Sequence, residues 1–138
     1  MRTRWLLSLT VGLPLLAVLG VVLLATRDGR QDLVLSDVVG RDAWSRSLMP
    51  GMRWATDELC GGELPCVEAV TSETLTLYRF EERDDAVAAA ERFGDQGYLT
   101  GWIAVRYEPG GLSDAERTDF EYGISCINTW VGEEGQDC

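Results

Sequence analysis

The chain has 138 residues, and its 12 Lys plus Arg against 23 Asp plus Glu give a formal net charge of −11. Every basic residue is arginine, and neither lysine nor histidine occurs. Without histidine, Ser-His-Asp and Cys-His catalysis are excluded and the commonest metal ligand is missing. Without lysine, Schiff-base chemistry is excluded. Because the excess negative charge repels phosphates, we expect no nucleic-acid partner.

An uncharged apolar run, WLLSLTVGLPLLAVLGVVLLA, occupies residues 5–25 and follows the arginine-containing residues 1–4. A helix over these 21 residues is about 30 Å long, which matches the hydrocarbon thickness of a bilayer. We therefore predict a transmembrane signal anchor over residues 5–25, with Trp5 at the interface and residues 1–4 in the cytoplasm.

Two alternatives for this run stay open. A cleaved signal peptide would release a secreted soluble domain, although Ala25 at position −1 would put Leu23 at position −3, where a small residue is preferred. A buried helix of a soluble fold is the other alternative. Because arginines flank both ends of the run, the positive-inside rule alone does not fix the orientation.

The polar residues 26–36 are typical of a juxtamembrane linker, and we place one extracytoplasmic α+β domain at residues 37–138. The first element expected in this domain is a short helix that opens at Ser36. The dipeptide Pro50-Gly51 ends it, because proline and glycine cannot continue a helix favourably.

The remaining elements follow in the order β-β-α-β-α. Two β-favouring runs, at 66–71 and 74–80, predict a hairpin. A helix over 81–94 has acidic residues in its first turn, and an alternating strand follows at 102–108. The sequence SDAE then forms a capping box that opens a last helix at Ser113. Its apolar stripe consists of Phe120, Ile124, Ile127 and Val131.

This order of elements predicts an N-terminal transmembrane helix followed by a small α+β domain. Both longer helices would cover one face of a three- or four-stranded sheet, because this buries both apolar stripes at once. The expected architecture is therefore a two-layer β-β-α-β-α sandwich.

Four cysteines, Cys60, Cys66, Cys126 and Cys138, favour two disulfides in a small domain behind an export-type N-terminus. We prefer the pairs Cys60–Cys66 and Cys126–Cys138, which join neighbours in sequence. A long-range pairing such as Cys60–Cys126 stays open. Since disulfides persist outside the cytoplasm, they also indicate that the domain is extracytoplasmic.

The cysteine spacings argue against metal binding and redox catalysis. Zinc sites usually contain C-x₂₋₄-C pairs, and thioredoxin-like dithiols need C-x-x-C, whereas the spacings here are C-x₅-C and C-x₁₁-C. Glu58 and Glu63 would also raise the pKa of the nearby thiols. We predict no metal site, no cofactor and no catalytic residue, with a four-cysteine zinc site as the alternative.

Two acidic groups are explained by helix starts and, for the second group, by the solvent face of the last helix. Negative side chains at a helix N-terminus are stabilised by the helix dipole. Neither group follows the spacing of a calcium-binding loop. A carboxylate-dependent enzyme would need two acids that converge elsewhere. The two groups are Glu81, Glu82, Asp84 and Asp85, and Asp114, Glu116, Asp119 and Glu121.

Four tryptophans belong to the predicted domain. We expect Trp102 and Trp130 in the core, because they lie on predicted regular elements. The other two flank the sequence MPGM with arginines nearby, which is typical of an exposed patch for a protein or glycan partner. Packing on the sheet explains them equally well. This patch consists of Trp44, Arg46, Arg53 and Trp54.

No phosphate loop, dinucleotide fingerprint or nucleophile elbow occurs in the sequence. We therefore expect a single-pass membrane protein without enzymatic activity, which contacts the bilayer through residues 5–25. Its acidic extracytoplasmic domain would act as a binding or interaction module at the cell surface. The alternatives are a carboxylate-dependent extracytoplasmic hydrolase or lyase, and a secreted soluble domain.

Overall fold

The computed structural model describes residues 29–39, 43–127, 129, 132, 135 and 137–138. The predicted cytoplasmic and transmembrane segments lie outside these residues. Within the described ranges, no helix combines the length and the apolar character that a membrane crossing requires.

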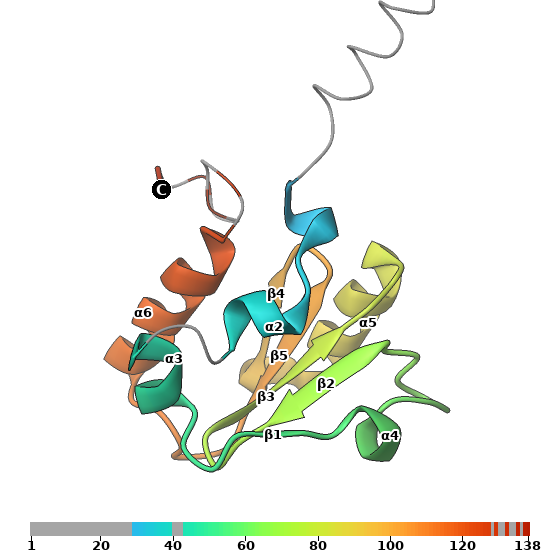
Figure 1. Cartoon of the computed structure of the whole chain (residues 1–138), viewed down its shortest axis with the longest axis horizontal. Coiled ribbons are helices and arrows are strands. Elements are labelled where there is room, and N and C mark those ends of the chain that lie inside the picture. The colour runs from blue at the N-terminus through green and yellow to red at the C-terminus, as the bar shows by residue number, and fades with distance from the viewer. Residues whose placement is uncertain (1–28, 40–42, 128, 130–131, 133–134, 136) are drawn as a thin grey trace, which may run out of the picture.

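A five-stranded antiparallel sheet forms the centre of the domain, with strand order β1-β2-β3-β5-β4 (Figure 1). The α+β class and the hairpin of β2 with β3 are confirmed. The sequence analysis predicted neither β1 nor β4. The strands are β1 (Arg53–Trp54), β2 (Glu68–Thr71), β3 (Leu75–Arg79), β4 (Gly97–Thr100) and β5 (Ile103–Tyr107).

Helices cover both faces of this sheet, so the predicted two-layer sandwich is wrong. Leu75 and Leu77 of β3 belong to a core cluster with α6 (Asp114–Ser125). Tyr78, the next residue, belongs to a second cluster with α5 (Arg83–Phe93). Because neighbouring residues of a strand point to opposite faces, α5 and α6 lie on opposite sides of the sheet.

The two longer helices begin and end for the reasons that the sequence indicates. Asp84 and Asp85 lie in the first turn of α5, and Gly94 ends the helix with φ of +56°. The capping box of α6 is present: the Glu116 N–H donates to the Ser113 hydroxyl, and the Ser113 N–H donates to the Glu116 carboxylate at 2.8 Å. The helix ends at Ser125, five or more residues earlier than its apolar stripe suggests.

The shorter helices differ from the expected pattern. Instead of one helix after Ser36, the structure has α2 (Leu35–Val38) and α3 (Ala43–Leu48), and residues 40–42 between them lie outside the described ranges. A one-turn helix, α4 (Thr56–Leu59), follows β1, and a short 3₁₀ helix, η2 (Gly94–Gln96), follows α5.

The segment predicted as a linker is part of the domain from residue 29 onward. It forms the 3₁₀ helix η1 (Gly29–Asp32) and continues into α2. Leu33 is 2% exposed and Leu35 is fully buried, and both belong to the cluster on the α6 side of the sheet. The short apolar run Leu33-Val34-Leu35 follows the polar and charged residues 26–32, whose composition by itself indicates a linker.

Candidate functional site

The predicted partner patch centres on β1, a two-residue strand at one edge of the sheet. Trp54 pairs with the buried Val70 of β2, yet 54% of the tryptophan surface is exposed. In the part of the chain that the structure describes, Tyr122 is the other large hydrophobic residue with comparable exposure, at 49%. An exposed tryptophan on a hydrogen-bonded strand is a rigid apolar contact surface.

The turn before β1 is fixed to the β2–β3 loop. The Thr74 hydroxyl donates to the Leu48 carbonyl at 2.5 Å, and the Glu73 N–H donates to the Pro50 carbonyl at 3.0 Å. Gly51 has φ of +66°, a left-handed conformation that glycine adopts without strain. The turn therefore holds α3 and β1 in a defined relation.

Arg53, the neighbour of Trp54 on β1, forms an ion pair with α4. Its guanidinium donates to both carboxylate oxygens of Glu58, at 2.7 and 3.1 Å. These hydrogen bonds, together with the charge of Arg53, lower the pKa of Glu58 from its ordinary value. Both side chains are exposed, so solvent screens the attraction. The two hydrogen bonds order the guanidinium of Arg53 on the exposed strand β1.

The structure does not test the patch as a whole. Arg46 is exposed on α3, and Arg53 and Trp54 are exposed on β1. Trp44 lies in α3, but its side chain is outside what the structure describes. The joint patch of four residues therefore stays a prediction. Trp102, expected in the core, is half-buried, while Trp130 lies outside the described residues.

Cys60 and Cys66 form the predicted disulfide, with their Cα atoms 5.0 Å apart. The loop that it closes is also held by two backbone hydrogen bonds between Gly61 and Leu64, at 2.7 and 3.0 Å. Arg92 of α5 donates to the Glu63 carbonyl at 2.9 Å. Cys66 is buried in the cluster on the α5 side. The disulfide is a structural staple next to the candidate partner surface.

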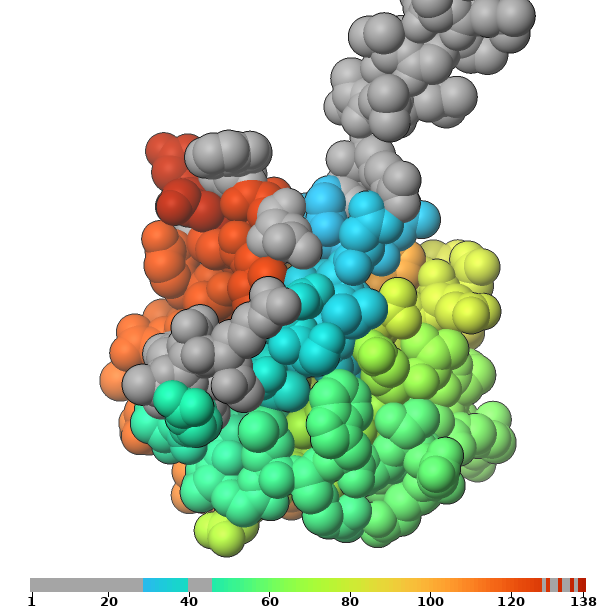
Figure 2. All heavy atoms as spheres, viewed as in Figure 1, coloured from blue at the N-terminus to red at the C-terminus, as the bar shows by residue number. Residues whose placement is uncertain are grey.

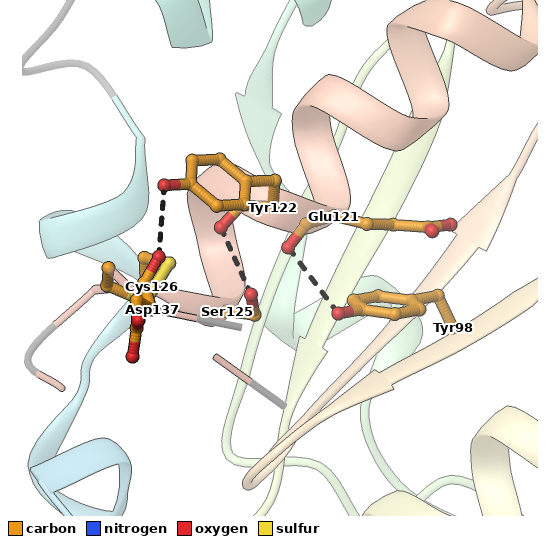
Figure 3. The surroundings of a disulfide bond; sticks show 7 residues. Tyr98, Glu121, Tyr122, Ser125, Cys126 and Asp137 are labelled. Carbon is orange, nitrogen blue, oxygen red and sulfur yellow. Dashed lines mark hydrogen bonds between the residues drawn. A yellow bond between two sulfur atoms is a disulfide. The ribbon is translucent and has the colours of Figure 1, made fainter. Parts of the chain in front are cut away.

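Cys126 and Cys138 form the second predicted disulfide, just after α6 (Figure 3). The exposed Tyr122 hydroxyl donates to the Asp137 carbonyl at 3.4 Å, and the Ser125 hydroxyl donates to the Tyr122 carbonyl at 3.0 Å. The cysteines described by the structure are thus all paired. A redox or zinc role for them is not supported by this pairing.

A polar cluster that the sequence analysis missed joins α6 to the sheet. The Tyr107 hydroxyl donates to the Glu121 carboxylate at 3.1 Å, and the Arg117 guanidinium lies 4.4 Å from the centre of the Tyr107 ring. Arg117 also donates to the Gln96 side chain. Burial, followed by the Glu121 charge, raises the pKa of Tyr107. The protonated tyrosine therefore positions α6. No periodic signal in the sequence indicates this contact.

Asp84, Asp85, Asp114 and Glu116 lie in the first turns of α5 and α6, as the sequence predicts. Glu121 is an exception, because it is half-buried and accepts the hydrogen bond from Tyr107 instead of lying on the solvent face of α6. Hydrogen bonds from Ser113 lower the pKa of Glu116, as a capping role requires. Among the residues that the structure describes, no group of three or more acidic or cysteine side chains could hold a metal ion.

Comparison of the chain with protein-family models, with curated proteins and with solved structures found no match. The function must therefore be argued from the residues and their geometry.

Proposed function

We propose that this chain is a single-pass membrane protein whose small extracytoplasmic domain binds a partner at the cell surface. The apolar residues 5–25 would anchor it in the bilayer. The surface that we assign to the partner is the exposed edge of the sheet at β1, with the Trp54 indole on one face of the strand and the Arg53–Glu58 ion pair on the other, and we call it the Trp54 surface.

One observation carries this assignment: an indole more than half exposed is held on a strand of the central sheet. Tryptophan and arginine are enriched among the residues that dominate binding energies at protein interfaces. Here the strand restricts the indole and the ion pair orders the guanidinium. Ordered side chains lose little conformational entropy on binding, which favours affinity.

The position of the Trp54 surface also suits a partner beyond the membrane. In Figure 1, β1 and α4 lie at the end of the domain opposite η1, where the described chain begins. Figure 2 shows the green segments that include them as a continuous surface at this end. An anchor that precedes η1 would direct the Trp54 surface away from the bilayer.

Photo-crosslinking in intact cells tests the proposal. A photoreactive phenylalanine analogue replaces Trp54 in the full chain and, in the matched control, Tyr122, which has similar exposure. We expect a discrete adduct from position 54 that the control position does not give. That adduct should disappear in a chain that also carries Arg53→Ala. Identical adducts from both positions, or none from position 54, would contradict the assignment.

The alternatives from the sequence analysis receive no specific support. A carboxylate-dependent hydrolase or lyase needs acids that converge, whereas the described acidic groups are spread over the starts of α5 and α6. A secreted domain would follow from cleavage before Thr26, and the mass of the mature N-terminus distinguishes it from the anchored form.

A further inference from the structure

The end of the domain where the described chain begins is built from two segments. η1 lies directly against the β4–β5 turn, because a Cβ atom added to Gly101 would come within 2.9 Å of the Arg30 Cβ atom. Figure 1 shows both segments at the same end, and the last described residues lie there too. We call η1 and the β4–β5 turn the η1 end.

The segment that starts at residue 29 is fixed on this end through Leu33 and Leu35. The Arg79 guanidinium donates to the Leu33 carbonyl at 2.7 Å, and the Leu35 N–H donates to the Glu68 carboxylate at 3.0 Å. Both leucine side chains are buried in the core. The chain from η1 to α2 therefore cannot lift from the sheet without exposing apolar surface and breaking two hydrogen bonds to charged groups.

The sequence leaves little chain between this fixed segment and the proposed span. Ala25 is the last residue of the apolar run, so only residues 26–28 separate it from Gly29. Three fully extended residues reach about 10 Å. The headgroup layer on each side of the hydrocarbon is roughly 5–8 Å thick. A tether this short holds the η1 end against the headgroups.

Trp102 has a side chain that is suited to the headgroup layer of the bilayer. It lies on the β4–β5 turn and is half-buried. Tryptophan is enriched where membrane and water meet, because its ring is apolar and its N–H is polar. The acidic chain disfavours anionic lipids, so a zwitterionic surface is the suitable partner.

We propose that the η1 end is seated on the bilayer surface by its short tether, with Trp102 in the headgroup layer. This inference rests on the proposed membrane anchor. It adds a second contact with the membrane and fixes the orientation of the domain. The Trp54 surface then points away from the bilayer.

Fluorescence quenching tests the seating. The full chain with Trp5→Phe, which removes the tryptophan of the span, is reconstituted in phosphatidylcholine vesicles that carry a nitroxide on the headgroup. Adding Trp102→Phe should lower the quenched fraction of the emission about two-fold, because the interfacial emitter is lost. Adding Trp54→Phe should raise that fraction, because a distant, unquenched emitter is lost. An unchanged fraction after Trp102→Phe, or a decrease after Trp54→Phe, would overturn the proposal.

Two controls separate the seating from the anchor. Flotation of the same vesicles reports insertion: a chain that fails to float overturns the anchor and the seating together, whereas a floating chain without quenching of Trp102 overturns the seating alone. Ten Gly/Ser residues inserted between Asp28 and Gly29 add a span of about 17 Å. We expect this insertion to abolish the difference that Trp102→Phe makes, and persistence of the difference would contradict the role of the tether.

Discussion

The two ends of the domain are held by different means. At the η1 end, Leu33 and Leu35 are buried, and charged side chains of β2 and β3 bind the backbone of the same segment. At the Trp54 surface, β1 has two residues, and both are exposed. The contrast shows that the segment from residue 29 onward is integral to the core, whereas β1 contributes exposed residues to the candidate partner surface.

The largest effect is expected from Leu35→Ala, which removes a fully buried side chain at the η1 end. We expect a loss of about 2–5 kcal/mol in the free energy of unfolding, because the lost transfer energy adds to that of a cavity. Denaturant unfolding of the full chain in detergent, followed by near-UV circular dichroism, measures it. The neighbouring exposed Ser36→Ala should stay within about 0.5 kcal/mol. Equal effects of the two substitutions would mean that the segment is a linker after all.

Removing each disulfide in turn compares how much each one contributes to the stability of the fold. Removing Cys126–Cys138 with serines should cost about 3 kcal/mol, and removing Cys60–Cys66 about 2 kcal/mol, since the longer loop restricts the unfolded chain more. The same unfolding assay under non-reducing conditions measures both. The reverse order would show that native-state contacts of the 60–66 loop outweigh the effect of loop length.

A smaller effect is expected from Glu68→Ala. This change leaves the Leu35 N–H without its acceptor and removes the carboxylate 3.8 Å from the Arg79 guanidinium. We expect a loss of about 1–3 kcal/mol, because both groups are partly buried. Glu81→Ala, on an exposed loop, is the matched control and should be nearly neutral. If Glu68→Ala left the free energy of unfolding unchanged, one of the two hydrogen bonds argued to hold the segment from residue 29 onward on the sheet would not contribute to its stability.

The smallest effect concerns pH at the Trp54 surface. Because the pKa of Glu58 is lower in the folded chain, its ion pair stabilises the fold above the ordinary carboxyl pKa, and this contribution is lost as the pH falls through the folded value. Carboxyl NMR titration should give Glu58 a midpoint below that of exposed glutamates, and Arg53→Ala should raise it. A Glu58 midpoint that does not respond to Arg53→Ala would show that the pair does not form in solution.

Local features of the fold were predictable from the sequence. The hairpin, α5 with its stop at Gly94, the capping box of Ser113 and Glu116, and both disulfide pairs are confirmed. Each depends on residues close together in the chain, where capping, turn chemistry and loop closure act directly.

The layering of the helices was missed, although one signal could have indicated it. Ile103, Ala104 and Val105 of β5 form an uninterrupted apolar run in the sequence. Such a run is typical of a strand covered on both sides. Periodicity shows which side of a helix is apolar, but it does not show which face of the sheet that side covers.

The side-chain contacts that join distant parts of the chain were less predictable. Glu68 with Leu35, and Tyr107 with Glu121, join residues far apart in sequence. Their pairing depends on the register of the sheet and on where η1 and α6 pack, and no local pattern specifies either. Trp54 is exposed, which is one of the two outcomes that the sequence left open for it.

The most direct test of the account is the sidedness of the domain in the membrane. A membrane-impermeant maleimide is applied to intact cells before and after a reductant, with lysed cells as the control. The account predicts labelling of intact cells that appears only after reduction, because the cysteines are paired and the domain faces outward. Thiols that react without reductant, and only after lysis, would place the domain in the cytoplasm and contradict both the anchor orientation and the disulfides.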